Sequence, residues 1–596
     1  MTSPANTRLP ISDDVEAVLP AAISRAHDWL KSTADEEDKA TEQLADLLRD
    51  EDGVKFTMDF VDRVMRPEDD KVAAHALKDI SSHYDPSFLG SINGALVGAG
   101  GFFGPILPNL VMPIARLYMR KMVGHLVLDA ESDALNKILD KAAESGEQLN
   151  LNLLGEAVLG EEEAKSRAER TLKLIQNPRV TYVSVKASSM VAQLNPWDID
   201  GSVERLKERL RPLYQAAADR TEKVFINMDM EEYHDLHLTI RLFKELLSEP
   251  EFLTLDAGIV LQAYLPDTFD ALKDVADFAK ERVAKGGGKV KVRIVKGANL
   301  SMETVQGEVH DWPLATYTNK LDVDANYYRL LDFILRDEYA DSVRIGVATH
   351  NLYTAAMAYE LGKKRGVLHM MDSEMLQGMS PAQQAAVRKV FDGRQILYTP
   401  VVHAEDFDVA VSYLVRRLEE NSAPQNFLYA LFAPGEEPLA DQEETFRRAV
   451  AKRWNTFAGA RRTQNRLEED GRQAPRTGRF TNEADTDPAL APNRQWAQEA
   501  LKSNPGEHGI AEVTDPAAVE SHIARAKELG TEWGKRPAAE RAAALEAVAD
   551  QIASQRGKFI SVAAYEANKT VTQTDPEVSE AIDFCTYYGQ SARLLE

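Results

Sequence analysis

From about residue 149 the chain repeats one pattern of hydrophobic and polar positions. A short apolar or alternating segment, typical of a strand, is followed by a longer segment with apolar residues every three or four positions, typical of a helix. Residues 235–247 and 353–365 are examples of these helical segments. The strand segments are residues 149–154, 181–186, 224–229, 258–264, 291–297, 343–349, 367–375 and 395–400. Eight strand–helix units in series predict a closed parallel (β/α)8 barrel, with a doubly wound open sheet as the alternative.

The segments on either side of the predicted barrel follow a different pattern. Residues 13–122 place apolar side chains at helical intervals, for example Ile23, Ala26, Trp29 and Leu30. Farther along, a polar and charged stretch resembles a linker, and helical spacing returns after it. The sequence therefore predicts a helical arm and helical region at 1–148, the barrel at 149–462, a linker at 463–487 and a mainly helical segment at 488–596.

Composition narrows the class of partner. The net charge of −25, without a local basic stripe, opposes binding to nucleic acid. Cys585 is the only cysteine, which excludes a disulfide framework and a cysteine metal cluster. The first residues lack the charged and apolar pattern of a signal peptide, so we expect a cytoplasmic protein. We expect no metal, because the neighbours of His350 offer no metal-ligand spacing.

One apolar stretch imitates a membrane-spanning helix. Residues 94–115 carry no charge and are about as long as a spanning helix needs to be. However, Pro105, Pro108 and Pro113 would break such a helix repeatedly. We therefore expect a buried or surface-docking segment, with peripheral contact to a membrane as an open alternative.

Polar side chains end every predicted strand, and in such barrels the chemistry gathers at the carboxyl ends of the strands. Arg416 and Arg417 then follow the eighth strand on a helical pattern, and two adjacent guanidinium groups suit a small carboxylic acid. Glu420 lies within side-chain reach of both arginines. Such a run is also typical of a solvated helix face, but its place above the predicted barrel mouth favours a site. The strand-end residues are Glu156, Lys186, Asp229, Gln262, Arg293, Lys296, Thr349, His350, Asn351, Glu374 and Tyr398.

The strand ends carry a series of short motifs in a fixed order: VSVKASS, INMDMEE, LQAY, RIVKGAN, VATHN and YTP, followed by YLVRRLEEN. This series resembles the proline dehydrogenase barrel, especially that of the bifunctional proline utilization A flavoenzymes. The resemblance covers about residues 149–432, and the helical region before it is similar more loosely. It implies a distorted (β/α)8 barrel that holds FAD.

The resemblance also implies roles for individual residues. Arg416 and Arg417 would bind the carboxylate of L-proline with Lys186 near the same anion, and Glu156 would pair with the first arginine as a gate. Asp229 would help to hold the lysine and the substrate region. The wall around the proline ring would be Ala298, Leu376, Tyr398 and Tyr413. The FAD would contact Gln262, Arg293, Val295, Lys296, Gly297, Lys320, Thr349, His350, Asn351 and Glu374.

Plain structural roles are the alternatives for several of these residues. Lys186 and Asp229 could form an ordinary buried ion pair, His350 could be a core histidine, and Tyr398 and Tyr413 could serve packing alone.

The resemblance implies oxidation of L-proline to Δ1-pyrroline-5-carboxylate, with flavin electrons passed to a quinone. The cationic cluster of both arginines and Lys186 would favour the neutral amine that can lose hydride. A quinone acceptor implies transient contact with the inner face of the cell membrane, for which residues 94–115 are a candidate. The alternatives are a flavoenzyme for hydroxyproline and a non-catalytic docking subunit for a separate aldehyde dehydrogenase.

The last segment, from about residue 488, resembles the opening helices of an aldehyde dehydrogenase domain. The nucleotide-binding βαβ unit and the catalytic cysteine of that family have no counterpart here, so aldehyde dehydrogenase activity is not expected. We interpret Cys585 as a packing residue. The apolar face of a partial domain is expected to need a partner or a second copy of the chain.

Overall fold

In the computed structural model, the residues of the chain fall into two compact units. The first unit comprises residues 1–194, 203–299 and 316–459, and the second comprises residues 195–202, 300–315 and 460–596. The predicted domain boundaries stay predictions. The described residues are 13–33, 51–84, 100–102, 104–123, 126–155, 158–403, 406, 410, 413, 414, 417, 420, 421, 423–433, 435, 437–469, 479–503 and 512–595.

Eight parallel strands close into a barrel in the first unit. Each strand pairs with the next in chain order from β2 to β9, and β9 then pairs with both β8 and β2. The register places Lys186 opposite Asp229 and Leu376 opposite Tyr398. The strands are β2 (Gln148–Leu153), β3 (Tyr182–Lys186), β4 (Phe225–Asp229), β5 (Ala257–Gln262), β6 (Val290–Val295), β7 (Val343–Ala348), β8 (Met371–Leu376) and β9 (Gln395–Val402). The predicted (β/α)8 barrel is confirmed, and the open sheet is excluded.

Two details of the strands differ from the prediction. A ninth strand, β1 (Leu128–Asp129), pairs with the end of β9 outside the closed barrel. Its two residues are too short for a periodic pattern to show. In addition, residues 368–370 of the predicted seventh strand form a 3₁₀ turn, and β8 begins only at Met371.

Helices follow the strands, as the apolar spacing predicted. Helix α10 (Leu236–Leu247) buries Leu238, Ile240 and Phe243. Helix α15 (Leu352–Lys364) is capped by Asn351, whose side-chain oxygen accepts the Thr354 backbone N–H. The other helices of the barrel region are α7 (Ser132–Glu144), α8 (Glu161–Gln176), α9 (Ile199–Asp219), α11 (Thr268–Ala284), α13 (Lys320–Ile334), α14 (Asp337–Ala340), α16 (Pro381–Val390), α18 (Phe427–Phe432) and α19 (Glu437–Lys452).

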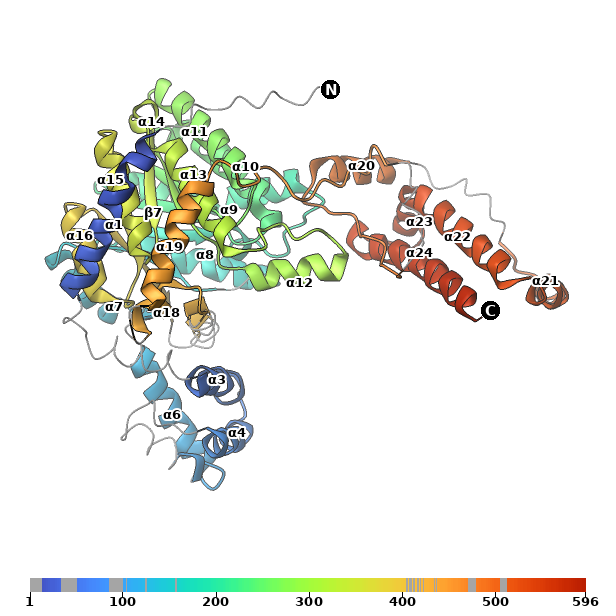
Figure 1. Cartoon of the computed structure of the whole chain (residues 1–596). Coiled ribbons are helices and arrows are strands. Elements are labelled where there is room, and N and C mark those ends of the chain that lie inside the picture. The colour runs from blue at the N-terminus through green and yellow to red at the C-terminus, as the bar shows by residue number, and fades with distance from the viewer. Residues whose placement is uncertain are drawn as a thin grey trace. The chain divides into compact units, whose positions relative to one another are not determined.

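The predicted helical arm begins with α1 (Asp14–Thr33), which lies along α15 and α16 (Figure 1). Its buried face includes Ala22, Ile23 and Trp29. Arg453, which directly follows α19, also donates to the Glu16 carboxylate at 2.7 Å, so charge and packing both hold α1 to the barrel helices.

Further helices of the N-terminal region form an apolar cluster with strand-end residues of the barrel. Phe60 and Leu77 belong to this cluster together with Leu154 and Leu414, and Leu376 and Tyr413 pack against it. The helices are α3 (Glu51–Phe60), a π-helical turn at Val61–Met65, α4 (Asp70–His83) and α6 (Pro108–Val123). The cluster connects this helical region with the end of the barrel that carries the site.

The apolar stretch at 94–115 is described from residue 100 onward, except for residue 103. Helix α6 continues through Pro113, and several large apolar side chains of the segment are exposed. Across the described part of the chain, no helix is both long enough and apolar enough to cross a membrane. The exposed side chains of the segment are Phe102, Ile106, Leu107, Leu110 and Ile114, and Leu117 of α6 is exposed directly after it.

The second unit is mainly helical. Helices α22 (Ala538–Ser554) and α24 (Val571–Leu594) pack against each other (Figure 1). Cys585 is half-buried against the cluster of Ala549, Val578 and Ile582. Helix α21 buries no residue. The helices are α12 (Leu300–His310), α20 (Ala491–Lys502), α21 (Pro516–Gly534), α22 (Ala538–Ser554), α23 (Arg556–Ala567) and α24 (Val571–Leu594).

Candidate active site

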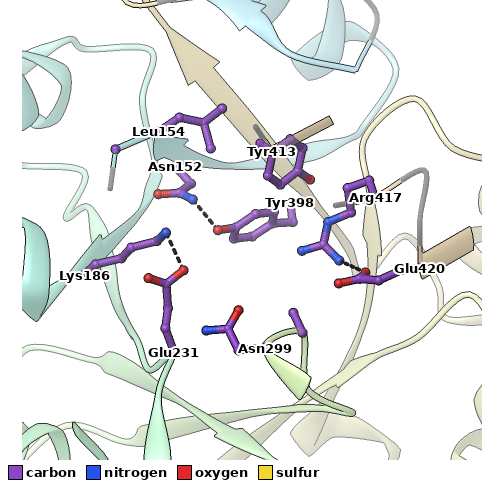
Figure 2. A pocket seen from close by; sticks show the side chains of 11 residues that line it. Asn152, Leu154, Lys186, Glu231, Asn299, Tyr398, Tyr413, Arg417 and Glu420 are labelled. Carbon is purple, nitrogen blue, oxygen red and sulfur yellow. Dashed lines mark hydrogen bonds and ion pairs between the residues drawn. The ribbon is translucent and has the colours of Figure 1, made fainter. Parts of the chain in front are cut away.

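A pocket lies at the carboxyl ends of the barrel strands, where the sequence predicted the site. Lys186 comes from the end of β3, Tyr398 from β9, and Arg417 from the helical backbone that follows β9 (Figure 2). The lining residues are Asn152, Leu154, Gly155, Lys186, Glu231, Ala298, Asn299, Tyr398, Tyr413, Arg417 and Glu420.

Each described cation of the pocket is paired with an acid. Lys186 Nζ lies 2.6 Å from Glu231 Oε1, and Arg417 donates to Glu420 Oε2 at 2.6 Å (Figure 2). Burial opposes the charge of Arg417, but the neighbouring Glu420 outweighs it and raises the pKa of the guanidinium. The expected pairing of Glu420 with an arginine is therefore present. Glu231 and Glu420 thus balance the charges of Lys186 and Arg417, while Arg416, the third cation of the predicted cluster, lies outside the described residues.

Asp229 contacts Tyr398, a predicted residue of the substrate wall, whereas Lys186 pairs with Glu231. Asp229 Oδ2 accepts a hydrogen bond from Tyr398 OH at 3.0 Å, and Asp229 Oδ1 accepts from Ser184 Oγ at 3.1 Å and Asn227 Nδ2 at 2.8 Å. Asn152 donates in turn to the Tyr398 hydroxyl oxygen. The lysine is held by Glu231, while Asp229 fixes the ring of Tyr398.

Burial controls the protonation of this buried network. It raises the pKa of Asp229, and the positive charges of Arg293 and Lys186 oppose that shift. Burial also raises the pKa of Tyr398 well above its usual range, with the charge of Asp229 acting in the same direction. Tyr398 is therefore a neutral hydrogen-bond donor at neutral pH.

Arg293 and Glu374, two predicted flavin contacts, lie inside the barrel. The Arg293 guanidinium carbon lies 4.3 Å from the centre of the Tyr398 ring, and its Nε is 2.9 Å from Glu374 Oε2. Glu374 is completely buried and does not line the pocket. Gln262 donates from Nε2 to the Glu231 carbonyl oxygen at 2.8 Å. Glu374 thus contacts Arg293, which in turn lies over the Tyr398 ring of the pocket wall.

Two of the predicted cofactor lysines converge on one acid. Lys296 Nζ lies 2.5 Å from Asp324 Oδ1, and Lys320 is paired with the other oxygen of Asp324. Burial lowers the pKa of Lys296, and the two lysines lower the pKa of Asp324 despite its burial. One net positive charge remains, which suits an anionic pyrophosphate. The neighbouring Gly297 has φ of 124°, and a Cβ there would come within 2.4 Å of the Tyr264 ring, so only glycine fits this bend.

The residues after β7 are held by local hydrogen bonds. His350 Nε2 accepts the Leu376 backbone N–H at 2.9 Å, and burial with the charge of Arg417 lowers the pKa of His350 to about 4. Thr349 Oγ accepts the Asn351 backbone N–H at 3.0 Å. The ring of His350 is therefore a neutral acceptor, and Asn351 works as a helix cap.

Val295 extends the strand ladder by accepting the Ala263 backbone N–H at 2.8 Å. Two predicted site residues, Glu156 and Arg416, lie outside the described residues.

Comparison with known proteins decides the family. Residues 134–430 match the proline dehydrogenase family. The barrel is a proline dehydrogenase domain. Residues 502–596 match the aldehyde dehydrogenase family, in agreement with the resemblance of the last helices.

Curated relatives of the proline dehydrogenase domain include the bifunctional protein PutA of Escherichia coli, 27% identical over 567 residues, which are 87% of this chain and 41% of the relative. PutA of Rhizobium meliloti is 28% identical over 422 residues, which are 65% of this chain and 33% of the relative. The chain thus spans less than half the length of these curated relatives.

Solved structures show the same architecture. PutA from Corynebacterium freiburgense is 52% identical with a TM-score of 0.69, and the match covers 80% of this chain and 46% of that one. PutA from Bdellovibrio bacteriovorus, inactivated by N-propargylglycine, is 25% identical with a TM-score of 0.76, and the match covers 97% of this chain and 61% of that one.

Sequence reasoning missed several residues of the proline dehydrogenase domain. Glu231 follows Asp229 at a spacing of two, so the motif INMDMEE offered a second acid at the same strand end. Asn152 occupies a polar position in the alternating segment LNLNLL, which was the available signal for an inward-facing amide. Asn299 directly follows the predicted wall residue Ala298, and Asp324 lies one helical turn after Lys320.

Proposed function

We propose that the proline dehydrogenase domain uses FAD to oxidise L-proline to Δ1-pyrroline-5-carboxylate and passes the electrons to a quinone. The observation that carries this proposal is the meeting of Lys186, Tyr398, Tyr413 and Arg417 around one pocket. These are the residue types that an anionic amino acid with an apolar ring requires: cations for the carboxylate and flat side chains for the ring. The family match and the PutA relatives support the same substrate class.

The carboxylate of the substrate would bind at Arg417. This guanidinium gives one N–H to Glu420, and its Nε is buried without a hydrogen-bond partner among the described residues. A carboxylate that enters the pocket can therefore bind the guanidinium by displacing Glu420. Lys186 offers a second cation on the pocket wall, at present held by Glu231.

The ring of the substrate would meet a rigid wall. Tyr398 is fixed through its hydroxyl by Asn152 and Asp229 and through its ring face by Arg293. Tyr413 lies near Arg417, whose guanidinium carbon is 5.2 Å from the centre of the Tyr413 ring. A clamped carboxylate and a fixed wall together hold a small ring in one orientation, which is the protein's contribution to hydride transfer.

Bound FAD would accept the hydride from the ring carbon beside the amine, because no side chain can do so. The residues present fit this cofactor in three respects. Lys296 and Lys320 leave one net positive charge for a pyrophosphate. Gly297 leaves room for the chain to bend after β6, and Arg293 and Gln262 place donor groups beside the pocket wall.

We further propose that the protein is cytoplasmic and meets its quinone at the inner face of the cell membrane. The exposed side chains of Phe102, Ile106 and Leu110 support a peripheral contact, because an apolar surface of this kind favours an interface with lipid. A second copy of the chain and an aldehyde dehydrogenase are further proposed partners, because α21 buries none of its residues.

An assay for the product tests the proposed activity. Δ1-pyrroline-5-carboxylate is trapped with an aromatic amino-aldehyde while a soluble quinone analogue accepts the electrons. The wild-type protein should form product from L-proline, and Arg417→Met should form at least tenfold less at subsaturating substrate. Arg241→Met is the matched control, because Arg241 pairs with Glu245 on the exposed face of α10 and should not affect the reaction.

Two results would redirect the proposal. Turnover of hydroxyproline without turnover of proline would favour a related flavoenzyme. No turnover of either amino acid by FAD-loaded protein would favour the docking subunit.

A further inference from the structure

A chain of charged side chains with alternating sign crosses strands β7, β8 and β6 inside the barrel. Arg344 donates to both Asp372 oxygens at 3.0 and 2.7 Å, and Asp372 Oδ2 lies 3.0 Å from Lys291 Nζ. Lys291 Nζ is in turn 2.6 Å from Glu374 Oε1, and Glu374 Oε2 is 2.9 Å from Arg293 Nε. The chain thus runs from a half-exposed arginine to the guanidinium that covers Tyr398.

The middle of this chain has almost no access to water. Lys291 is 1% exposed and Glu374 is not exposed at all. Lys291 precedes Arg293 by two residues on β6, and Asp372 precedes Glu374 by two on β8, so the four side chains project from the same face of the sheet. An ion taken out of water is costly unless it is paired, and Lys291 Nζ lies between the carboxylates of Asp372 and Glu374.

The way in which Lys291 and Arg293 share Glu374 defines the role of the lysine. An arginine beside a lone carboxylate usually binds both oxygens through two parallel hydrogen bonds. Here Lys291 Nζ lies at Oε1, and the closest approach of Arg293 to the carboxylate is from Nε to Oε2. The guanidinium is then free to lie over the Tyr398 ring, with NH1 3.8 Å from Asp229 Oδ1.

We propose that Lys291 is a positioning residue of the site: by occupying Oε1 of Glu374, it limits Arg293 to Oε2 and keeps the guanidinium against Tyr398. The inference deepens the proposed function, because it rests on Arg293 and Tyr398 belonging to the substrate and flavin site.

Gly346 supports this arrangement independently. A Cβ at this position of β7 would lie 2.1 Å from Glu374 Oε1 and 3.0 Å from the Cε of Lys291. Both atoms are buried within the barrel and have little room to move. Gly346 therefore leaves the space in which Lys291 and Glu374 meet, and Gly346→Ala separates them without changing any charge.

Crystal structures of Lys291→Met and Gly346→Ala test the positioning directly, with or without flavin. In both variants, Glu374 Oε1 loses the lysine, and the Arg293 guanidinium should turn to bind both carboxylate oxygens and leave the Tyr398 ring. Gly160→Ala is the control, because a Cβ at Gly160 meets nothing within 4 Å, and Arg293 should stay in place there. An unmoved Arg293 in both test variants overturns the proposal.

The reduction potential of the bound flavin gives a second readout, measured with dithionite and a reference dye so that no proline oxidation is needed. When the Arg293 charge moves away, the reduced flavin, which is more negative than the oxidised flavin, should become less favourable. The equilibrium constant for reduction should fall about tenfold in both test variants, which lowers the potential by about 30 mV for a two-electron couple. Gly160→Ala should keep the wild-type potential.

A purely structural role of Lys291 would lower the melting temperature and leave the potential unchanged, which overturns the proposal. Wild-type protein that binds flavin but is not reduced by proline contradicts the proposed function alone. The movement of Arg293 then still decides the role of Lys291.

Discussion

Removal of one oxygen atom in Tyr398→Phe should measure how strongly the pocket wall is held. The hydroxyl accepts from Asn152 and donates to Asp229 Oδ2 at 3.0 Å, while the ring carries Arg293 on its face. Phenylalanine keeps the ring and loses both hydrogen bonds. Asp229 then keeps two donors, Ser184 and Asn227, both of which bind its other oxygen.

The cost follows from the burial of the two partners. A hydrogen bond to a charged group contributes about 1.5–3 kcal/mol, and a buried neutral donor left unpaired costs about 1 kcal/mol more. We therefore expect the free energy of unfolding to fall by about 3 kcal/mol. For a domain of this size the melting temperature should fall by about 6 °C, at about 2 °C per kcal/mol.

The loss should also depend on pH. Burial already raises the pKa of Asp229, and removal of a donor from its carboxylate raises that pKa further. An acid whose folded pKa is raised gives stability that is present at low pH and is lost as the pH rises through the folded pKa. The difference between variant and wild type should therefore be larger at neutral pH than near pH 3.8, the usual pKa of an aspartate.

Calorimetric unfolding at both pH values measures these differences, and Tyr214→Phe is the matched control. The Tyr214 hydroxyl is buried without a hydrogen-bond partner among the described residues, so its removal should be neutral or slightly stabilising. Equal melting temperatures for Tyr398→Phe and Tyr214→Phe, at both pH values, would refute the reasoning about this network.

Three further predictions concern other parts of the site. Glu420→Gln removes the acid that competes with the substrate carboxylate for Arg417, so the KM for proline should fall about two- to fivefold in steady-state kinetics. This factor corresponds to a partly exposed ion pair of about 0.5–1 kcal/mol. An increase in KM would show that Glu420 orients the arginine instead. The pKa of His350 is lowered from 6.5 to about 4, so as the pH falls the histidine takes up a proton in the unfolded state before it does so in the folded state. The free energy of unfolding should therefore decrease between pH 6.5 and pH 4, by at most about 3 kcal/mol. His350→Gln should flatten this part of the stability profile, and an unchanged profile would contradict the lowered pKa of His350. Gly297→Ala places a Cβ against the Tyr264 ring at a residue with positive φ, so the protein should retain less flavin through gel filtration. The ratio of visible to ultraviolet absorbance measures the retained flavin. Full retention would show that this bend is not needed for the cofactor.

The sequence predicted the barrel well because its strands are periodic and long enough to recognise. All eight predicted strands overlap strands of the barrel, whereas β1 escaped because two residues show no period. The local pairing of Arg417 with Glu420 could also be predicted, since three residues on a helix bring side chains together.

Contacts between distant strands could not be predicted in the same way. Spacing along the chain cannot show that Lys186 chooses Glu231 over Asp229, because both acids lie near the same strand end and the choice depends on side-chain direction. Lys291 and Glu374 meet across β6 and β8, at a place where Gly346 leaves room, and alternation alone shows neither the partner nor the space. Such pairings arise from the closure of the barrel.

The visible spectrum of the purified, FAD-loaded protein under anaerobic conditions, before and after addition of L-proline, tests the central claim most directly. The account predicts that proline bleaches the flavin band, that Arg417→Met largely loses this response, and that Arg241→Met keeps it. A protein that takes up FAD but keeps its oxidised spectrum with proline, or a protein that cannot take up FAD at all, would contradict the account.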